Sequence, residues 1–495
     1  MKIVIGYPPV KTKGGGTPLL QQNRQYQEFH NPTFLYPVIM STAATLLRDL
    51  GHKVYWLDGI ARGMSQEQYI DACKQINPDL IAFESKSPAV KSHWDFVRKI
   101  KTSLPSVKVV MLGEHGTSFP EESFENSPVD YVFAGGHFDF GLKYLTTALE
   151  NKEKIPEGFF YREGKKVIGS KKFIFKEHLD TLPFPDRVLT RCFEDYQAEF
   201  NIRGRPFAYT MSGRDCWYGK CTFCSWDSIM FPKGSFRSRS PENTLAEVDM
   251  LINKFGVREI FDDAGTITIG SWLDKFCDLL IDGKYYKKID YSCNMRFGYR
   301  DQKNYDKMKK AGFRLLKFGL ESANQKTLEM LDKDVDVTKI EQECRDIKKA
   351  GLTVHLTMMV GYPWETKEDA LNTLRLAKNL MHKGYADVLQ STVVMPYPGT
   401  ALWRQAIEHK WFRPEFDHTN YDNYDMTMPV MKTPDMNPKE VMAICDNIYK
   451  DIFLKPKYIY QHLKKIRTVD DIKYTLRGVK AVMGHVKDFS RTPQL

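Results

Sequence analysis

The chain contains 495 residues, of which 42% are hydrophobic and 27% charged, and its formal net charge is +10. One hydrophobic core rarely serves a chain of this length, so two or three domains are expected. No stretch approaches the ~18 consecutive apolar residues of a membrane-spanning helix, and the opening MKIVIGYPP begins a strand pattern without a secretory signal, which predicts a cytoplasmic protein.

Residues 1–150 alternate short apolar runs with helical patterns. The runs are KIVIGY, HKVYWLDG, DLIAFES, VKVVMLG and DYVFAGG. This order predicts an α/β domain with a doubly wound parallel sheet, whose ligands bind beyond the carboxyl ends of the strands. Those ends carry Pro8, Gly113, Glu114, His115, Gly135 and Gly136. No G-x-G-x-x-G follows the first run, so a dinucleotide site is not favoured.

A second series of strands and helices occupies residues 206–400, after a charged and proline-rich connector at 151–205. Its strand patterns are AYTMSG, REIFDDA, DYSCNMR, RLLKFGLES, TVHLTMMVGYP and DVLQSTVVMPYP. Six such units predict a partial (β/α)6 barrel with an open side. Residues 401–495 have the pattern of helices and loops, which predicts a helical C-terminal domain.

The first strand of the second series leads into SGRDCWYGKCTFCSW, which places Cys216, Cys221 and Cys224 close together. Barrel enzymes keep their chemistry on such loops, at the carboxyl ends of the strands. Three thiolates can hold three irons of a 4Fe-4S cluster and leave the fourth iron open to a ligand. The alternative, a zinc site, normally needs a fourth Cys or His nearby, and no histidine has that spacing.

The segment CWYGKCTFC resembles the C-x3-C-x2-C signature of radical S-adenosylmethionine (SAM) enzymes, although its first gap holds four residues instead of three. Gly219 is the residue of this gap that can absorb the extra backbone. The ends of later strands follow the family pattern in order. The resemblance implies SAM contacts from Phe223, Asp262, Asp263, Asn294, Arg296, Glu321, Ser322 and Met395.

These strand ends also have ordinary structural interpretations. Acidic residues at strand ends often cap the following helix, and Pro-Gly turns close loops. Arg296 could equally neutralise a carboxylate of the cofactor or form a structural salt bridge. The resemblance implies reductive cleavage of SAM to a 5′-deoxyadenosyl radical that attacks an unactivated carbon, with an electron donor such as flavodoxin or ferredoxin.

A doubly wound domain before the cluster domain resembles the cobalamin-binding branch of this superfamily. The fragments NPTFLYPVIMSTAATLL, LGEHGTSFP and DYVFAGG carry the likeness. It implies a bound cobalamin in contact with Pro8, Thr33, Gly113, Glu114, His115, Gly135 and Gly136. The D-x-H-x-x-G motif is absent, which predicts a corrinoid without a histidine lower ligand, although His115 and His137 lie at strand ends. A domain that binds no corrinoid is the alternative.

Within this branch, CTFCSWDSIMFPKGSFRSRSPEN and the basic ending are most similar to hopanoid ring-contracting, lipid-modifying and anaerobic magnesium-protoporphyrin monomethyl ester cyclase enzymes. The likeness implies methylation, or ring formation or contraction, of a large and hydrophobic small-molecule substrate. Residues 455–495 hold ten Lys or Arg against three Asp. Apolar residues recur among them at helical spacing, which suits docking at a membrane surface or packing against the open side of the barrel.

Two alternatives from other classes remain. An RNA methylthiotransferase shares the radical domain, but that family has a second cysteine triplet, and only Cys73 and Cys192 precede the motif here. Nucleic acid is therefore not an expected partner. A corrinoid-binding sensor or carrier with a structural iron-sulfur site would not cleave SAM.

Overall fold

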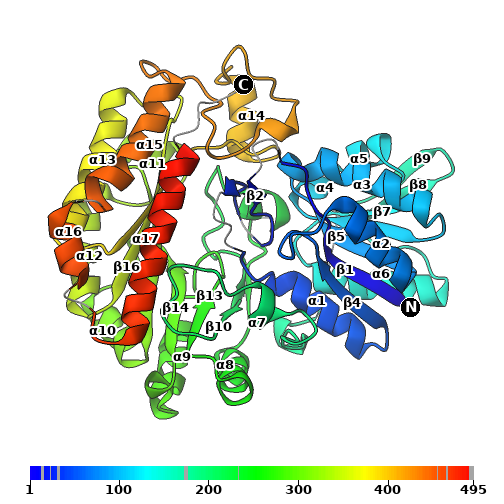
Figure 1. Ribbon diagram of the computed structural model, residues 1–495, viewed down its shortest axis with the longest axis horizontal. Coiled ribbons are helices and arrows are strands. Elements are labelled where there is room, and N and C mark those ends of the chain that lie inside the picture. The colour runs from blue at the N-terminus through cyan, green and yellow to red at the C-terminus, as the bar shows by residue number, and fades with distance from the viewer. Residues whose placement is uncertain are drawn as a thin grey trace.

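The computed structural model describes residues 1–12, 16–22, 24–29, 34–171, 177–231, 233–453, 455–463 and 466–489. Two α/β lobes lie side by side, one formed by the N-terminal residues and the other by the middle of the chain (Figure 1). The predicted layout, a doubly wound sheet followed by a partial barrel and a helical region, is confirmed. Thr33, an expected cobalamin contact, lies outside the described residues.

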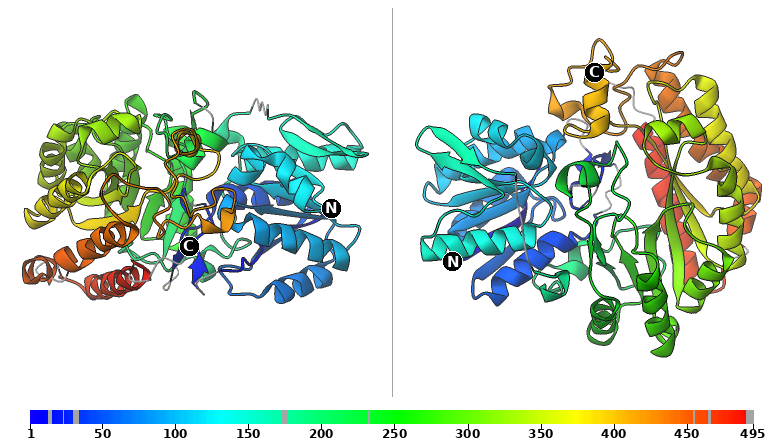
Figure 2. Two further views of the ribbon diagram at one scale, coloured as in Figure 1. Left: turned by 90° about the horizontal axis from the view of Figure 1, so that it is seen from above. Right: turned by 180° about the vertical axis from the view of Figure 1, so that it is seen from behind.

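The first lobe contains a seven-stranded sheet in the order β4-β1-β5-β6-β7-β8-β9. Its first five strands are parallel, and their apolar runs are almost wholly buried. The strands are β1 Lys2–Tyr7, β4 Lys53–Asp58, β5 Leu80–Glu84, β6 Lys108–Leu112 and β7 Tyr131–Phe133. The helices pack in two pairs, α1 (Val38–Asp49) with α6 (Phe138–Asn151) and α2 (Gln66–Ile76) with α3 (Val90–Ser103) (Figure 2).

This sheet continues beyond residue 150, into the segment expected to be a connector. Two antiparallel strands, β8 (Phe159–Glu163) and β9 (Lys166–Gly169), extend it from β7. The hairpin turns at Gly164, whose φ is +61°. Its charged residues, which indicated a loop, lie on β-strands at the edge of the sheet, where side chains remain exposed.

The second lobe contains six parallel strands in chain order, which begin at β10 and end at β17. The strands are β10 Phe207–Thr210, β13 Glu259–Asp262, β14 Asp290–Met295, β15 Phe313–Glu321, β16 Thr353–Val360 and β17 Val388–Val393. The helices that connect them are α8 Pro241–Phe255, α9 Ser271–Asp282, α10 Gln302–Lys310, α11 Gln325–Met330, α12 Ile340–Lys349 and α13 Lys367–His382. β10 and β17 do not pair within the described residues, so the barrel is open between them.

The C-terminal region is helical, with α14 Ala401–Glu408, α15 Pro438–Phe453, α16 Pro456–Leu463 and α17 Val469–Phe489. One face of α17 packs against the barrel. Val482 contacts the core of the second lobe, and an Arg477 Nη2 donates to the carbonyl of Ile202 at 3.0 Å. Packing against the open side, one of the two expected roles of this tail, is therefore present. Among the described residues, no helix is long and apolar enough to span a bilayer.

Gly113 allows a close approach between the ends of β5 and β6. Its φ is +102°, and a Cβ there would lie 2.4 Å from the carbonyl oxygen of Ser85. Because both backbone strain and a clash would result, Gly113→Ala is expected to lower the free energy of unfolding by more than about 2 kcal/mol, measured by urea denaturation. Gly478→Ala in α17 is the control, since a Cβ there meets nothing within 4 Å and should stabilise by about 0.5–1 kcal/mol. Equal effects of the two substitutions would contradict the prediction.

Candidate active site

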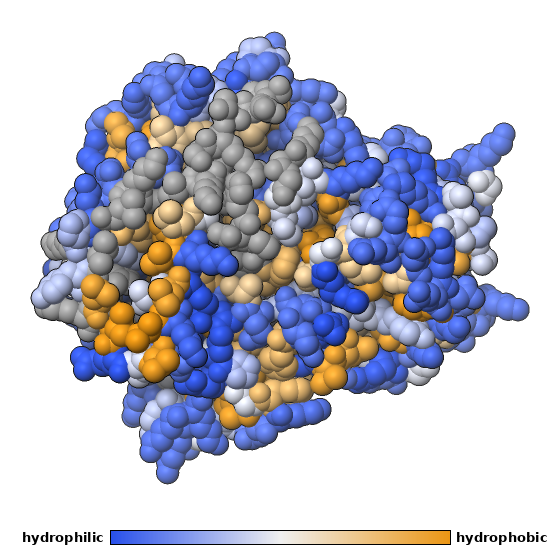
Figure 3. Space-filling view, in the orientation of Figure 1, coloured by the Kyte–Doolittle hydropathy of each residue, from blue (hydrophilic) through white to orange (hydrophobic). Residues whose placement is uncertain are grey.

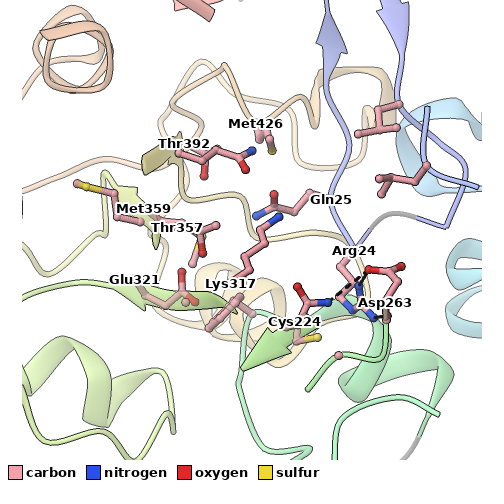
Figure 4. Close-up of a pocket in the computed structure, with 18 of the residues that line it drawn as sticks. Arg24, Gln25, Cys224, Asp263, Lys317, Glu321, Thr357, Met359, Thr392 and Met426 are labelled. Atoms are coloured by element: carbon pink, nitrogen blue, oxygen red, sulfur yellow. Dashed lines mark hydrogen bonds and ion pairs between the residues drawn. The ribbon is translucent and has the colours of Figure 1, made fainter. Parts of the chain in front are cut away.

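A cavity of about 300 Å³ lies at the carboxyl ends of the β10–β17 sheet. All three cysteines of the motif line it, together with residues from all six strands or the loops that follow them. The first lobe closes it with residues of the segment between β1 and α1, among them Arg24 and Gln25 (Figure 4). Residues of both lobes therefore line this first cavity.

The loop between Cys216 and Cys221 is held by its own aromatic residues. Trp217 Nε1 donates to the carbonyl of Ile267 at 3.1 Å, and the Tyr218 hydroxyl donates to the carbonyl of Asp332 at 2.7 Å. Gly219 has φ +59°, a conformation that glycine adopts without strain. The four-residue gap is therefore accommodated by a left-handed turn at Gly219 between two anchored aromatic side chains.

The three thiols are partly buried, free of disulfides and close to polar groups. Cys216 Sγ lies 3.3 Å from Thr266 Oγ1, and Cys221 Sγ lies 3.7 Å from Arg296 Nη1. Burial raises the pKa of all three thiols, that of Cys216 to about 11, so metal binding must release their protons.

Six of the eight expected SAM contacts line this cavity. They are Phe223, Asp263, Asn294, Arg296, Glu321 and Met395. The other two are engaged elsewhere. The Asp262 carboxylate accepts hydrogen bonds from the backbone N–H groups of Ser212 and Ala264, and Ser322 Oγ donates to Glu365 Oε1 at 2.6 Å. Both of these side chains hold strand ends in place and do not line the cavity.

Arg24 joins the first lobe to the cysteine loop. Its Nε and Nη2 donate to the two carboxylate oxygens of Asp215 at 2.9 and 2.7 Å. Its Nη1 lies 3.3 Å from Asp263 Oδ1, and its Nη2 donates to the Asp263 carbonyl at 2.7 Å. The guanidinium also covers the ring of Trp226, at 4.6 Å from the centroid. Sequence patterns did not indicate this residue.

Glu321 and Arg296 are fixed by partners that the sequence did not indicate. Glu321 ends β15 with φ +59°, after a shift in the register with β16, and its carboxylate pairs with Lys333. The Arg296 guanidinium lies 3.5 Å from the ring centroid of Tyr218 and donates to the carbonyl of Lys333. Arg296 thus stands beside Cys221 without a carboxylate partner in the described residues.

The strand ends of the first lobe border a second cavity of about 660 Å³. Gly135 and His137, after β7, line it together with Ile229 and Met230 of the short π-helix η3 (Trp226–Met230), which directly follows the cysteine loop. Gly136 lies beside it, and its N–H donates to the Met230 carbonyl at 3.0 Å. Four further expected cobalamin contacts, Pro8, Gly113, Glu114 and His115, are buried and line neither cavity.

His115 is enclosed by aromatic rings. The centroids of Trp94, Phe119 and Tyr421 lie 5.5, 5.6 and 5.0 Å from that of its imidazole, and Nδ1 is 3.1 Å from Ser87 Oγ. Burial lowers the pKa of His115 to about 3, so the ring is neutral. It fills space between the first lobe and the segment that contains Tyr421.

Comparison with known proteins places the cysteine loop in a defined family. Residues 211–377 match the model of the radical SAM superfamily. An uncharacterized methyltransferase of Pyrococcus horikoshii is 27% identical over 454 residues, 90% of this chain and 94% of the relative. The anaerobic magnesium-protoporphyrin IX monomethyl ester cyclase of Cereibacter sphaeroides is 22% identical over 83% of this chain and 65% of its own length.

The whole chain shares its fold with a solved radical SAM methyltransferase, TsrM from Kitasatospora setae, whose structure holds cobalamin and a 4Fe-4S cluster. The TM-score is 0.68 at 14% identity, over 98% of this chain and 99% of TsrM. The match to the radical SAM superfamily implies a 4Fe-4S cluster and SAM as cofactors. The chain therefore contains a radical SAM domain at residues 211–377, as an enzyme of the radical SAM type does, and it shares the two-lobed fold of TsrM.

Proposed function

We propose that the protein is a cobalamin-dependent radical SAM methyltransferase. The observation that carries this proposal is the position of the second cavity. This cavity lies between the carboxyl ends of the first lobe's strands and η3, the element that follows the cysteine loop. A corrinoid bound there would be next to the first cavity, which the three thiols line.

The residues of the first cavity have distinct roles in this proposal. Cys216, Cys221 and Cys224 hold the cluster, and Arg296 beside Cys221 receives the SAM carboxylate. Glu321 and Asp263, each already oriented by a basic side chain, accept hydrogen bonds from SAM. When bound, the cluster supplies the electron that cleaves SAM and the corrinoid supplies the methyl group.

The residues that line the second cavity suit a corrinoid. Gly135 and Ala134 leave a surface without large side chains on one wall, and Met230 and Trp403 provide apolar surface for a flat macrocycle. Lys171, on the same cavity, offers positive charge to the phosphate of the nucleotide tail. His115 lies outside this cavity and His137 lines it, so of the two strand-end histidines only His137 is placed to act as a lower ligand.

The lower ligand is testable by spectroscopy. The electron paramagnetic resonance spectrum of the bound cobalamin in its Co(II) form should lack nitrogen superhyperfine splitting, in the wild type and in His115→Ala alike. A splitting that disappears in His137→Ala would contradict this, because His137 is the histidine that lines the cavity.

The experiment that tests the function is anaerobic. The purified protein is analysed for iron, sulfide and corrinoid, reduced in the presence of SAM, and assayed for S-adenosylhomocysteine and 5′-deoxyadenosine. About four irons, a bound corrinoid and both products would support methyl transfer. Deoxyadenosine alone would favour ring chemistry or oxidation, and intact SAM would leave a corrinoid carrier or sensor.

An RNA methylthiotransferase is not favoured. Cys73 and Cys192, the two cysteines before the motif, are buried on α2 and on α7 (Cys192–Asp195), and burial raises the pKa of both thiols, to about 12 and about 11. Neither belongs to a group of metal-binding side chains in the described part of the chain.

We also propose that α17 contacts an anionic lipid surface, through which a hydrophobic substrate reaches the enzyme. An apolar stripe of four side chains lies on its outer face, 47–64% exposed, consisting of Ile472, Leu476, Val479 and Met483. Figure 3 shows hydrophobic surface gathered where α17 lies in Figure 1. Lys473 and Lys480 lie on the same helix and supply positive charge for lipid head groups.

Leu476→Glu is expected to weaken binding to vesicles that contain phosphatidylglycerol by about tenfold or more, because a buried leucine contributes about 1.5–3 kcal/mol. Co-sedimentation measures it. Val188→Glu is the matched control, since Val188 is 66% exposed but belongs to the connector. Equal binding to neutral phosphatidylcholine vesicles, or no effect of Leu476→Glu, would contradict the proposal.

A further inference from the structure

Five polar side chains in the interior of the barrel have no partners among the residues that the structure describes. Lys317 of β15 lines the first cavity together with Gln25, Thr357, Gln390 and Thr392, from the segment before α1 and from strands β16 and β17. Figure 4 shows Lys317 extending toward Gln25, with Thr357 and Thr392 around the same space. In the part of the chain that the structure describes, none of the five side chains makes a hydrogen bond or an ion pair. Partly buried polar groups without partners are costly, so they indicate a ligand.

Among these five side chains the one charged group is the ammonium of Lys317, which is positive. The Lys317 ammonium has three hydrogens to donate, whereas the amides and hydroxyls around it can donate or accept. Of the other cations of the cavity, Arg24 contacts Asp215 and Asp263, and Lys333 pairs with Glu321. Arg296 lies beside Cys221, at the cluster site. The five side chains include no carboxylate. They therefore suit an anion and not a cation.

Glu199, the acidic residue with the largest electrostatic effect on Lys317, does not complete this site. It forms no ion pair within 4.0 Å of Lys317 among the described residues. Its Oε1 accepts from the backbone N–H groups of Phe200 and Asn201, at 3.1 and 3.3 Å, and its Oε2 lies 3.4 Å from the Tyr209 hydroxyl. The Glu199 carboxylate therefore already accepts hydrogen bonds from other groups, and the three N–H donors of the Lys317 ammonium remain available to a ligand.

SAM also carries a carboxylate, but a different cation stands next to the cluster site. Arg296 is 3.7 Å from Cys221, whereas Lys317 lies on the same strand as Glu321 and four residues before the strand's end. The wall of the same cavity also contains four methionines, Met358, Met359, Met395 and Met426. Thioether side chains adapt to ligands of irregular shape.

We propose that the barrel interior binds the carboxylate of an amphiphilic substrate. Lys317 pairs with the carboxylate, the two glutamines and two threonines donate to it, and the methionines contact the apolar part of the molecule. The identification of this ligand as the substrate rests on the proposed function, but its binding is measured at equilibrium and needs no turnover.

The test is anaerobic calorimetry on the full chain as purified, with and without saturating SAM. The probes are decanoate, its neutral methyl ester and decyl phosphate. Wild type should bind decanoate about tenfold or more tightly than the ester, because the ester lacks the charge-assisted hydrogen bonds. Lys317→Met should abolish this preference and leave SAM affinity within about twofold of wild type.

Lys309→Met is the control, since Lys309 lies on α10 and does not line the cavity. If Lys317→Met fails to fold, Gln390→Leu should weaken the binding of decanoate and leave the binding of SAM unchanged. Three outcomes would overturn the proposal: no preference for decanoate over the ester, equal binding of decyl phosphate, or an equal loss of SAM affinity in Lys317→Met, which would assign the ammonium to the cofactor. A protein that prefers decanoate but leaves SAM intact would contradict the proposed function alone.

Discussion

Replacing Arg24 by methionine is expected to lower the free energy of unfolding by about 3–5 kcal/mol, the cost of leaving a buried ion pair without one partner. Arg24 holds two carboxylates, those of Asp215 and Asp263, whose side chains are 0% and 7% exposed. Methionine keeps the apolar contact with Trp226 but removes every hydrogen bond. The measurement is the shift of the urea midpoint, followed by tryptophan fluorescence.

The control is Arg48→Met, because Arg48 also contacts two carboxylates but at 42% exposure, where an ion pair contributes less than about 1 kcal/mol. Adding Asp215→Asn to Arg24→Met should recover part of the loss, since one of the two unpaired charges is then removed. The prediction would be wrong if Arg24→Met lowered the free energy of unfolding by less than about 1 kcal/mol, or if the double variant recovered none of it. The ion pair would then not stabilise the contact between the lobes.

Sequence reasoning could not have found this contact. Arg24 and Asp215 are 191 positions apart, and Arg24 lies in a segment without regular periodicity. An arginine in such a segment carries no local signal of its partner. The same holds for Lys333, which follows α11 and pairs back to the end of β15.

At the strand ends, the sequence pattern predicts which pairs of polar residues lie near the cavity, but not which member of each pair lines it. Adjacent residues of a strand point to opposite sides, and in two polar pairs of this barrel one member faces the cavity and the other faces away. At the end of β13, Asp263 lines the cavity and Asp262 bonds to Ser212 and Ala264. At the end of β15 the same division separates Glu321 from Ser322. The sequence predicted both pairs, but the choice within each pair required the direction of the strand.

Lys317 illustrates a different limit. Its position inside an otherwise apolar run, RLLKFGLES, was visible, but a lysine within a strand can face solvent at an edge or the interior of a barrel. β15 lies between β14 and β16 and is not an edge strand, and Lys317 lines the cavity, so its side chain faces the interior of the barrel. The fold, more than the local pattern, turns this lysine into a candidate ligand-binding residue.

Single alanine substitutions of Cys216, Cys221 and Cys224 are expected to have the largest effect on activity. Each removes one of three thiolates, and no other cysteine lines the cavity to replace it. Iron should fall from about four per chain to less than about one, the absorbance of the cluster should disappear, and reductive cleavage of SAM should be lost. Anaerobic iron analysis and chromatography of the products measure these changes.

Cys293→Ala is the matched control. Cys293 lies on β14, in the same sheet, but its thiol is buried in the core and does not line the cavity. This variant should lose some stability and keep both its iron and SAM cleavage. If an alanine variant of the motif retained the full iron content, or if Cys293→Ala lost it, the cluster would not be held by the loop between β10 and α8. The four-residue gap would then be the feature that separates this chain from the family it otherwise matches.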